Sequence, residues 1–347
     1  MLAPERGGPS PSSATSLIDA ARRIASEVLA PAADDTDQAE IVPAGHLRAL
    51  ADAGLMALFC PEAGADGATR WKVFETLAAA CGVTFFVWVQ HHAPVRLLVG
   101  SENDALRRRW LPPLCSGETL GGVAFAHLRR SGPPPVTVRA VEGGYLLEGE
   151  APYVTSWGLA GLFAVAARLG EHRVVFVLVP ADAAGLRPSS PLRLAVMAAS
   201  STVRLGFDRL FVPASDVIVD LSLGEWQAKD RVATARPNPA AFGVAAASIR
   251  LLEERDEDAA GVFEAERLEC WTRSVEADPE DLERLVELRA WSLDLALRSA
   301  QALVAATGGG AMELSHPAQR LLREASFYAI QAQTSELRRA TLARLRR

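Results

Sequence analysis

Apolar residues recur at helical spacing near both ends of the chain, and short strand-like runs fill the middle. The helical pattern covers residues 15–115 and is densest at residues 85–99, where nearly every position is apolar. A helix that is apolar on all sides is buried, so we predict that this one lies at the centre of a bundle. Pro112 and Pro113 are expected to end the last helix of this region.

From about residue 120 the pattern changes to short runs rich in strand-forming residues. Gly143 and Gly144 lie between two such runs and favour a hairpin turn. Residues 162–168 and 174–179 are continuous apolar runs, each typical of a buried strand. We therefore predict a small antiparallel β domain that closes near residues 213–217.

Helical periodicity returns after residue 223, with a long amphipathic stripe over residues 282–304 and Pro317 at a favoured early helix position. The order of patterns predicts an α+β fold. Its expected parts are a disordered lead (1–14), an N-terminal helical domain (15–119), a middle antiparallel β domain (120–222) and a C-terminal helical bundle (223–347).

Composition narrows the classes of partner. The 347 residues carry a formal net charge of −6 and no long basic block, so nucleic acid and anionic membranes are poor partners. No apolar run approaches the length of a spanning helix, and no apolar signal core follows the first residues. The four cysteines are far apart with no zinc spacing, which predicts reduced buried thiols, no metal site and a cytoplasmic protein.

A glycine cluster and a spaced motif lie near the C-terminus. The motif residues are Gly308, Gly309, Gly310, Pro317, Arg320, Arg323, Glu324, Ala325 and Thr334. This stretch resembles the C-terminal signature of the acyl-CoA dehydrogenase family, a GG-x-G turn followed by P-x-x-R-x-x-R-D-A and Y-E-G-T. The resemblance implies that Gly308 and Gly309 meet the adenosine half of an FAD bound by the neighbouring subunit, and that Thr334 meets the flavin or its phosphates. Taken alone, glycines after a helix are typical of a C-cap.

Residues 147–158, L-E-G-E-A-P-Y-V-T-S-W-G, resemble the block L-N-G-x-K-x-W-I-T-N-G, which lies against the flavin in this family. By resemblance, Tyr153 takes the place of the aromatic beside the flavin ring, and Thr155 that of the threonine whose hydroxyl meets flavin N5. Alternate side chains of a strand share one face, so both residues are expected to point the same way. The alternative is an ordinary strand with a buried tyrosine and a strand-favouring threonine.

Residues 121–128 occupy the position of the family's A-x-T-E-P-x-x-G-S-D loop, with Arg129 and Arg130 in place of its Glu-Pro. The resemblance implies that three residues here line the flavin ring: Phe125, Ala126 and Leu128. The two arginines are expected either at a solvated rim or in contact with a substrate phosphate.

Two departures separate the chain from the family pattern. The family's proton-abstracting glutamate falls on Ala332, which cannot accept a proton. The R-x-x-F-G segment, whose arginine meets the flavin pyrophosphate, has no counterpart in residues 253–271. Asp230 and His91 remain as candidate catalytic residues. For His91, a core or interface histidine with satisfied hydrogen bonds is the alternative.

The resemblance implies a flavin-dependent oxidoreductase that removes an α proton and a β hydride from an acyl thioester, carried by CoA or by an acyl carrier protein. Its base would be non-standard. The flavin would lie between the β domain and the C-terminal bundle of a homodimer, or of a homotetramer built as a dimer of dimers. The alternatives are a flavin-dependent monooxygenase or oxidase, and a flavin-free redox-neutral enzyme or non-catalytic homologue on the same fold.

Overall fold

The computed structural model describes residues 11–346. The disorder predicted for residues 1–10 lies outside the described residues, whereas residues 11–14 belong to the first helix. The N-terminal part is helical and has these elements: α1 (Pro11–Ile24), η1 (Ala25–Leu29), α2 (Ala33–Gln38), α3 (Ala44–Asp52), η2 (Leu55–Ala57), η3 (Pro61–Ala63), α4 (Gly67–Ala80), α5 (Gly82–Val99) and α6 (Asp104–Ser116).

One sheet forms the middle of the chain, with the strand order β6-β7-β3-β2-β4-β5-β8 and β1 paired to β4. Its elements are β1 (Gly121–Ala124), η4 (Ala126–Arg129), β2 (Val136–Val141), β3 (Gly144–Val154), β4 (Leu162–Leu169), β5 (Arg173–Pro180), β6 (Leu186–Pro188), η5 (Ala198–Ser200), β7 (Val203–Pro213), η6 (Ala214–Asp216) and β8 (Val217–Ser222). The hairpin predicted at Gly143 is confirmed, with the glycine at φ 77° between antiparallel β2 and β3.

The sheet is mixed rather than antiparallel. β1 runs parallel to β4 over four residue pairs, and β2 meets β4 in parallel at Thr137. The apolar runs therefore predicted strands correctly but not their directions, because direction depends on how distant segments are connected.

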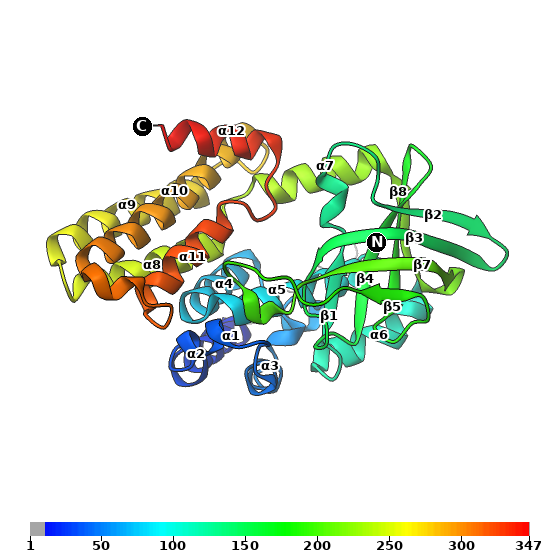
Figure 1. Cartoon of the computed structure of the whole chain (residues 1–347), viewed down its shortest axis with the longest axis horizontal. Coiled ribbons are helices and arrows are strands. Elements are labelled where there is room, and N and C mark those ends of the chain that lie inside the picture. The colour runs from blue at the N-terminus through cyan, green and yellow to red at the C-terminus, as the bar shows by residue number, and fades with distance from the viewer. Residues whose placement is uncertain (1–10, 347) are drawn as a thin grey trace, which may run out of the picture.

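Helices return after β8 and complete the chain with α7 (Leu223–Ala235), α8 (Pro239–Glu253), α9 (Glu257–Glu276), α10 (Leu282–Thr307), η7 (Gly308–Met312), α11 (Pro317–Tyr328) and α12 (Ser335–Arg344). In Figure 1 the C-terminal helices lie on one side, the sheet on the other, and the N-terminal helices below and between them, while α7 leads from the sheet to the bundle. The predicted boundaries at 119/120 and 222/223 fall between α6 and β1 and between β8 and α7.

Polar residues just before the helices explain where several of them begin. Asp66 accepts a hydrogen bond from the backbone of Thr69 at 2.7 Å and caps α4. Asn238 caps α8 in the same way, and Pro239 follows at the first helical position. Such caps satisfy backbone donors that have no partner inside the helix. The helix starts are therefore specified locally by the sequence.

The apolar residues of the predicted helices and strands form three hydrophobic cores. One core joins helices from both ends of the chain and includes the buried helix α5, as predicted. A second core lies inside the β domain, and a third lies between the sheet and helices α5 and α6. Alternate residues of β4 enter these last two cores, Phe163 on one side and Ala164 on the other. Burial on both faces explains why the β4 run is continuously apolar.

A close approach of α4 and α8 depends on Gly243. A Cβ atom at this position would lie 2.5 Å from the carbonyl oxygen of Glu75. The absence of a side chain therefore lets the two helices pack backbone against backbone.

Two local expectations were wrong. Helix α6 continues through Pro112 and Pro113 to Ser116 and ends at Gly117, whose φ is 77°. Proline removes a backbone donor but holds φ near the helical value, so it does not by itself end a helix. Cys60 and Cys115 form a disulfide, whereas the remaining two cysteines are free and buried, Cys81 and Cys270.

Within residues 11–346, no helix combines the length and the apolar character needed to cross a membrane.

Candidate functional site

Five buried hydroxyl side chains gather where β3 ends and β7 begins: Thr155, Ser156, Ser200, Ser201 and Thr202. The hydroxyl oxygens of Thr155 and Thr202 lie 3.3 Å apart, and those of Ser200 and Thr202 lie 2.8 Å apart. The Ser156 backbone N–H also donates to the Ser200 carbonyl at 2.9 Å. We call these five residues the hydroxyl cluster. It is a chain of donors and acceptors within the protein interior.

The backbone around the hydroxyl cluster is strained. Among the described residues, six non-glycine residues have a left-handed φ, and four of them lie in or beside the cluster: Tyr153 at 56°, Ser156 at 70°, Met197 at 61° and Ser201 at 48°. This conformation is costly for residues with a Cβ atom. Strained residues concentrate at functional sites, so their grouping supports a site here.

Tyr153 and Thr155 do not share one environment. Tyr153 is 55% exposed, whereas Thr155 is only 4% exposed. The left-handed φ of Tyr153 and a register irregularity between β3 and β7 interrupt the alternation expected of a strand. The guanidinium of Arg130 lies 5.5 Å from the Tyr153 ring centroid. Tyr153 therefore presents its ring at the surface beside a cation.

The predicted ring-lining loop lies next to β3. Phe125 and Leu128 pack against the core between the sheet and the helices, and Ala126 is exposed. His127, which the sequence patterns did not single out, is buried, and its Nε2 lies 3.0 Å from the Ala166 carbonyl oxygen. This contact fixes the short helix η4 on β4.

An ion pair joins the β domain to the C-terminal helices. The Arg129 guanidinium donates to both carboxylate oxygens of Asp230, at 2.8 and 2.6 Å. Both side chains are largely buried, with exposures of 20% and 13%. Arg129 is therefore neither a free rim residue nor free for a phosphate. Asp230 can accept a proton only after this pair opens.

The loop that carries Ala332 is held by buried polar contacts. Arg289 donates to the Thr234 carbonyl at 2.8 Å and to the Gln331 carbonyl at 3.0 Å. Asn238 donates to the Gln331 side chain at 3.3 Å. Ala332 itself has a φ of 51°. The position where the family has its base is therefore a fixed, left-handed turn that α7, α8 and α10 support.

Arg289 is a buried cation whose pKa falls to about 10, chiefly because of burial and then because of the charge of Arg129, although Asp230 opposes this. It contacts carbonyl oxygens rather than a carboxylate. We infer that its main effect is to fasten the ends of α7 and of the Ala332 loop to α10.

The glycine turn lies in η7, between α10 and α11 and away from the sheet (Figure 1). Gly308 has a φ of 73°, and a Cβ atom at Gly308 or Gly309 would meet no atom within 4 Å. Thr334 accepts a hydrogen bond from the Leu337 N–H at 3.2 Å and caps α12. Within one chain, these residues do not come together with the hydroxyl cluster.

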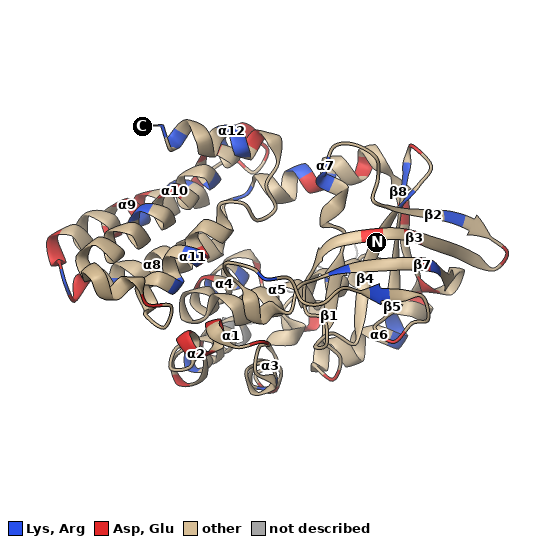
Figure 2. Cartoon of the chain, in the orientation of Figure 1, with Lys and Arg blue, Asp and Glu red and all other residues tan. Residues whose placement is uncertain are grey.

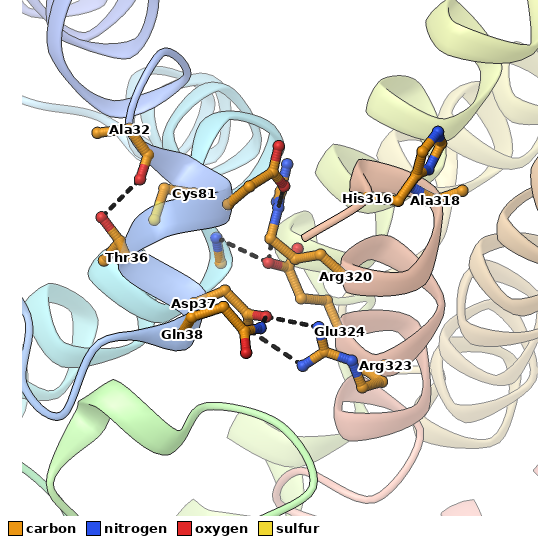
Figure 3. A network of polar contacts seen from close by, with 12 residues as sticks. Ala32, Thr36, Asp37, Gln38, Cys81, His316, Ala318, Arg320, Arg323 and Glu324 are labelled. Carbon is orange, nitrogen blue, oxygen red and sulfur yellow. Dashed lines mark hydrogen bonds and ion pairs between the residues drawn. The ribbon is translucent and has the colours of Figure 1, made fainter. Parts of the chain in front are cut away.

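The arginines of the C-terminal motif form a clamp between helices far apart in sequence (Figure 3). Arg320 donates to Asp34 at 2.7 Å and to Glu324 at 3.0 Å, and Arg323 donates to Asp37 at 3.2 and 2.5 Å. Figure 2 shows the acidic positions of α2 near the basic positions of α11. We call these five residues the α2–α11 clamp. In this chain the motif holds domains together.

Glu324 is the most deeply buried member of the clamp, at 1% exposure. One carboxylate oxygen accepts from Arg320 and from the Gly82 backbone N–H at 3.3 Å, and the other has no partner. Burial raises the pKa of Glu324, although the positive charge of Arg320 acts to lower it. Although burial disfavours its charge, Arg320 also has a raised pKa because of Glu324 and Asp34.

His91 is fully buried in α5, and its Nδ1 accepts a hydrogen bond from the Gly121 backbone at 3.0 Å. Burial lowers the pKa of His91 to about 4, so the ring is neutral at pH 7. The neighbouring His92 is also buried, and burial again lowers its pKa. The structure therefore places His91 against the first strand as a positioning group for β1.

Acidification between pH 6.5 and about 4 should destabilise the protein. Burial lowers the pKa of both His91 and His127 to about 4, whereas an unfolded histidine titrates near 6.5. The unfolded state thus binds more protons in this window, and each histidine should contribute a loss on the order of 3 kcal/mol. Urea unfolding at pH 7, 6 and 5 measures the slope.

The exposed His172 provides the control for this pH dependence. His91→Gln should flatten the slope, and His172→Gln should leave it unchanged. A free energy of unfolding that stays constant from pH 7 to pH 5 in the natural protein would contradict the assignment.

Comparisons with known proteins agree with this architecture. Residues 12–118 match the family model described as "Acyl-CoA dehydrogenase, N-terminal domain". Benzylmalonyl-CoA dehydrogenase of Aromatoleum aromaticum is 25% identical over 94% of this chain and 96% of its own length. Human short-chain specific acyl-CoA dehydrogenase is 22% identical over 94% of this chain and 88% of its own.

Solved structures share the whole fold. The glutaryl-coenzyme A dehydrogenase complex superposes with a TM-score of 0.83 at 16% identity, covering 98% of this chain and 97% of that one. Butyryl-CoA dehydrogenase from Megasphaera elsdenii gives a TM-score of 0.79 at 16% identity, covering 99% and 100%. Residues 12–118 thus match the N-terminal domain of the acyl-CoA dehydrogenase family, and the whole chain is similar to acyl-CoA dehydrogenases in sequence and shares their helical–sheet–helical fold.

Proposed function

We propose that the chain is an acyl-CoA dehydrogenase-like oxidoreductase that binds FAD beside the end of β3. Its substrate would be an acyl thioester, carried by CoA or by an acyl carrier protein. The observation that carries this proposal is the strained hydroxyl cluster, of which Thr155 and Ser156 lie in the segment that resembles the family's flavin-facing block. The relatives in the comparison are named as dehydrogenases of acyl-CoA compounds, which supports the same reaction class.

The residues around the hydroxyl cluster fit the ring end of a flavin. The Ser156 hydroxyl is buried without a hydrogen-bond partner, which is uncommon unless a ligand or water supplies one. The Thr155 hydroxyl keeps bonding capacity beyond its contact with Thr202. The exposed ring of Tyr153 offers a flat apolar face.

We assign flavin contacts residue by residue. The ring end would meet Phe125, Ala126, Leu128, Tyr153 and Thr155. In a homodimer or a dimer of dimers, the adenosine half would meet the open glycine turn of a neighbouring copy, at Gly308 and Gly309, and Thr334. A bound FAD would supply the hydride acceptor for oxidation of the thioester.

Removal of the α proton needs a group other than residue 332. His91 is buried and already accepts the Gly121 N–H, so we do not assign it this role. Asp230 is our candidate base, and Arg129 is the residue that restrains it. Opening of this ion pair would free a carboxylate oxygen and would also loosen the contact between η4 and α7.

An absorbance spectrum of the purified protein tests the proposal. We expect flavin bands, and we expect at least one member of a panel of acyl thioesters to bleach them in the absence of oxygen. Thr155→Val keeps the shape of the side chain but removes its hydroxyl, so it should slow bleaching or lower flavin content. A colourless protein that takes up no added FAD would refute the proposal.

Two observations favour a second function: residue 332 is an alanine, and the Asp230 carboxylate is already paired with Arg129. A flavin-dependent monooxygenase or oxidase on the same fold needs no base for an α proton. In that case no thioester would bleach the flavin, and the protein would consume oxygen when a separate reductase supplies reduced flavin.

A further inference from the structure

Two arginine side chains meet at one phenyl ring in the N-terminal helical domain. The guanidinium carbon of Arg70, in α4, lies 4.9 Å from the Phe59 ring centroid, and that of Arg96, in α5, lies 5.2 Å from it. Among residues 11–346, neither guanidinium has a carboxylate oxygen within the 4.0 Å of an ion pair. Both cations therefore stack on the same aromatic ring.

The surroundings balance these two charges only in part. The acidic group Asp66 interacts with Arg70, but its carboxylate also caps α4 through the Thr69 N–H at 2.7 Å. One guanidinium nitrogen of Arg70 donates to the Ala65 carbonyl at 2.9 Å. Arg96 is exposed at the surface, but partial desolvation, and then the positive charge of Arg70, lowers its pKa. Two like charges therefore repel each other in a protein whose net charge is negative.

A third polar group lies beside the same ring. The His92 ring centroid is 5.2 Å from that of Phe59, and His92 is 2% exposed. Neither of its ring nitrogens has a hydrogen-bond partner within the described chain. Buried polar atoms without partners call for an explanation, of which a bound water or ion is one.

We propose that Arg70 and Arg96, which share the Phe59 ring beside His92, form a binding site for a phosphate-type dianion. Guanidinium groups present planar pairs of donors that match phosphate oxygens. A dianion between the arginines would replace their mutual repulsion with two charge-assisted contacts. The ligand is either free phosphate or the phosphate ester of a cofactor such as CoA.

This site shares no residue with the hydroxyl cluster and needs no flavin, so it goes beyond the proposed function. Its test measures binding alone. A negative result would leave the dehydrogenase proposal untouched, and a colourless protein would leave this site untouched.

Calorimetric titration of the full-length protein with inorganic phosphate at low ionic strength is the direct test. We expect binding to weaken by about tenfold or more in Arg70→Gln and in Arg96→Gln, because each removes one charged donor set. Arg108→Gln is the matched control: it removes the same charge from an exposed arginine in α6 and should bind phosphate normally. Unfolding temperatures without phosphate show whether each variant is folded.

Two further ligands identify the source of the phosphate. If CoA binds more tightly than 3′-dephospho-CoA, and Arg96→Gln abolishes the difference, the site takes a phosphate ester. If the two bind alike while inorganic phosphate still requires both arginines, the site takes free phosphate. Absence of phosphate binding in the natural protein, or equal weakening by Arg108→Gln, would overturn the proposal.

Discussion

Ala332→Glu should raise the rate at which acyl thioesters reduce the bound flavin by about 10²–10⁴-fold, the usual contribution of a positioned general base. The loop that carries residue 332 is already fixed, because Arg289 and Asn238 both bind Gln331. A glutamate there would project from a defined backbone. Stopped-flow absorbance under anaerobic conditions measures the rate with a panel of thioesters.

Ala332→Gln is the control, because glutamine has the size of glutamate but cannot take a proton. Residue 332 has a φ of 51°, so both variants carry the same backbone cost of about 1–2 kcal/mol. Equal rates in the two variants, with flavin bound in both, would contradict the idea that the lack of a base at residue 332 limits this chain. A large gain in the glutamate variant alone would also argue against the oxidase alternative.

Arg320→Met should lower the free energy of unfolding by about 3–5 kcal/mol, because it leaves the buried Glu324 carboxylate without its cation. The methionine keeps most of the side-chain volume, so lost charge rather than lost packing dominates. Since burial raises the pKa of Glu324, the deficit should be smaller at pH 5 than at pH 8, where the carboxyl group must be ionised. Urea unfolding of the variant and the natural protein at both pH values measures it.

An exposed ion pair supplies the comparison. Arg231 contacts Glu336 at 2.9 Å with exposures of 58% and 36%, and Arg231→Met should cost less than about 1 kcal/mol. Replacing Arg320 and Glu324 together with methionine should restore much of the stability lost in the single variant. If Arg320→Met is no more damaging than Arg231→Met, the α2–α11 clamp does not contribute as we describe.

Local patterns in the sequence were sufficient for most of the secondary structure. The uninterrupted apolar run of α5 predicted its central position, and the Gly143 turn predicted the first hairpin. These features depend on neighbours within a few residues, where periodicity and turn preference act. The parallel pairing of β1 with β4 and the continuation of α6 past its prolines depend on more than such neighbours, and the prediction failed there.

The candidate site was only partly predictable for the same reason. The sequence pointed to Thr155 but not to Ser200 and Thr202, which come from a distant segment and complete the hydroxyl cluster. The sequence also pointed to Asp230, but it did not show that Asp230 forms an ion pair with Arg129, which lies about a hundred positions earlier in the chain. An ion pair between residues so far apart in the sequence leaves no periodic pattern, so it becomes visible only in the folded structure.

The α2–α11 clamp also has a consequence for folding during translation. Arg320 and Asp34 are separated by 286 positions, so the ribosome releases the acidic partner long before the basic one exists. Until then the nascent N-terminal helices lack α11, whose Glu324 contacts Gly82. The N-terminal helices can therefore complete their packing only when translation is nearly finished. A stalled or truncated chain would therefore expose this surface to chaperones and proteases.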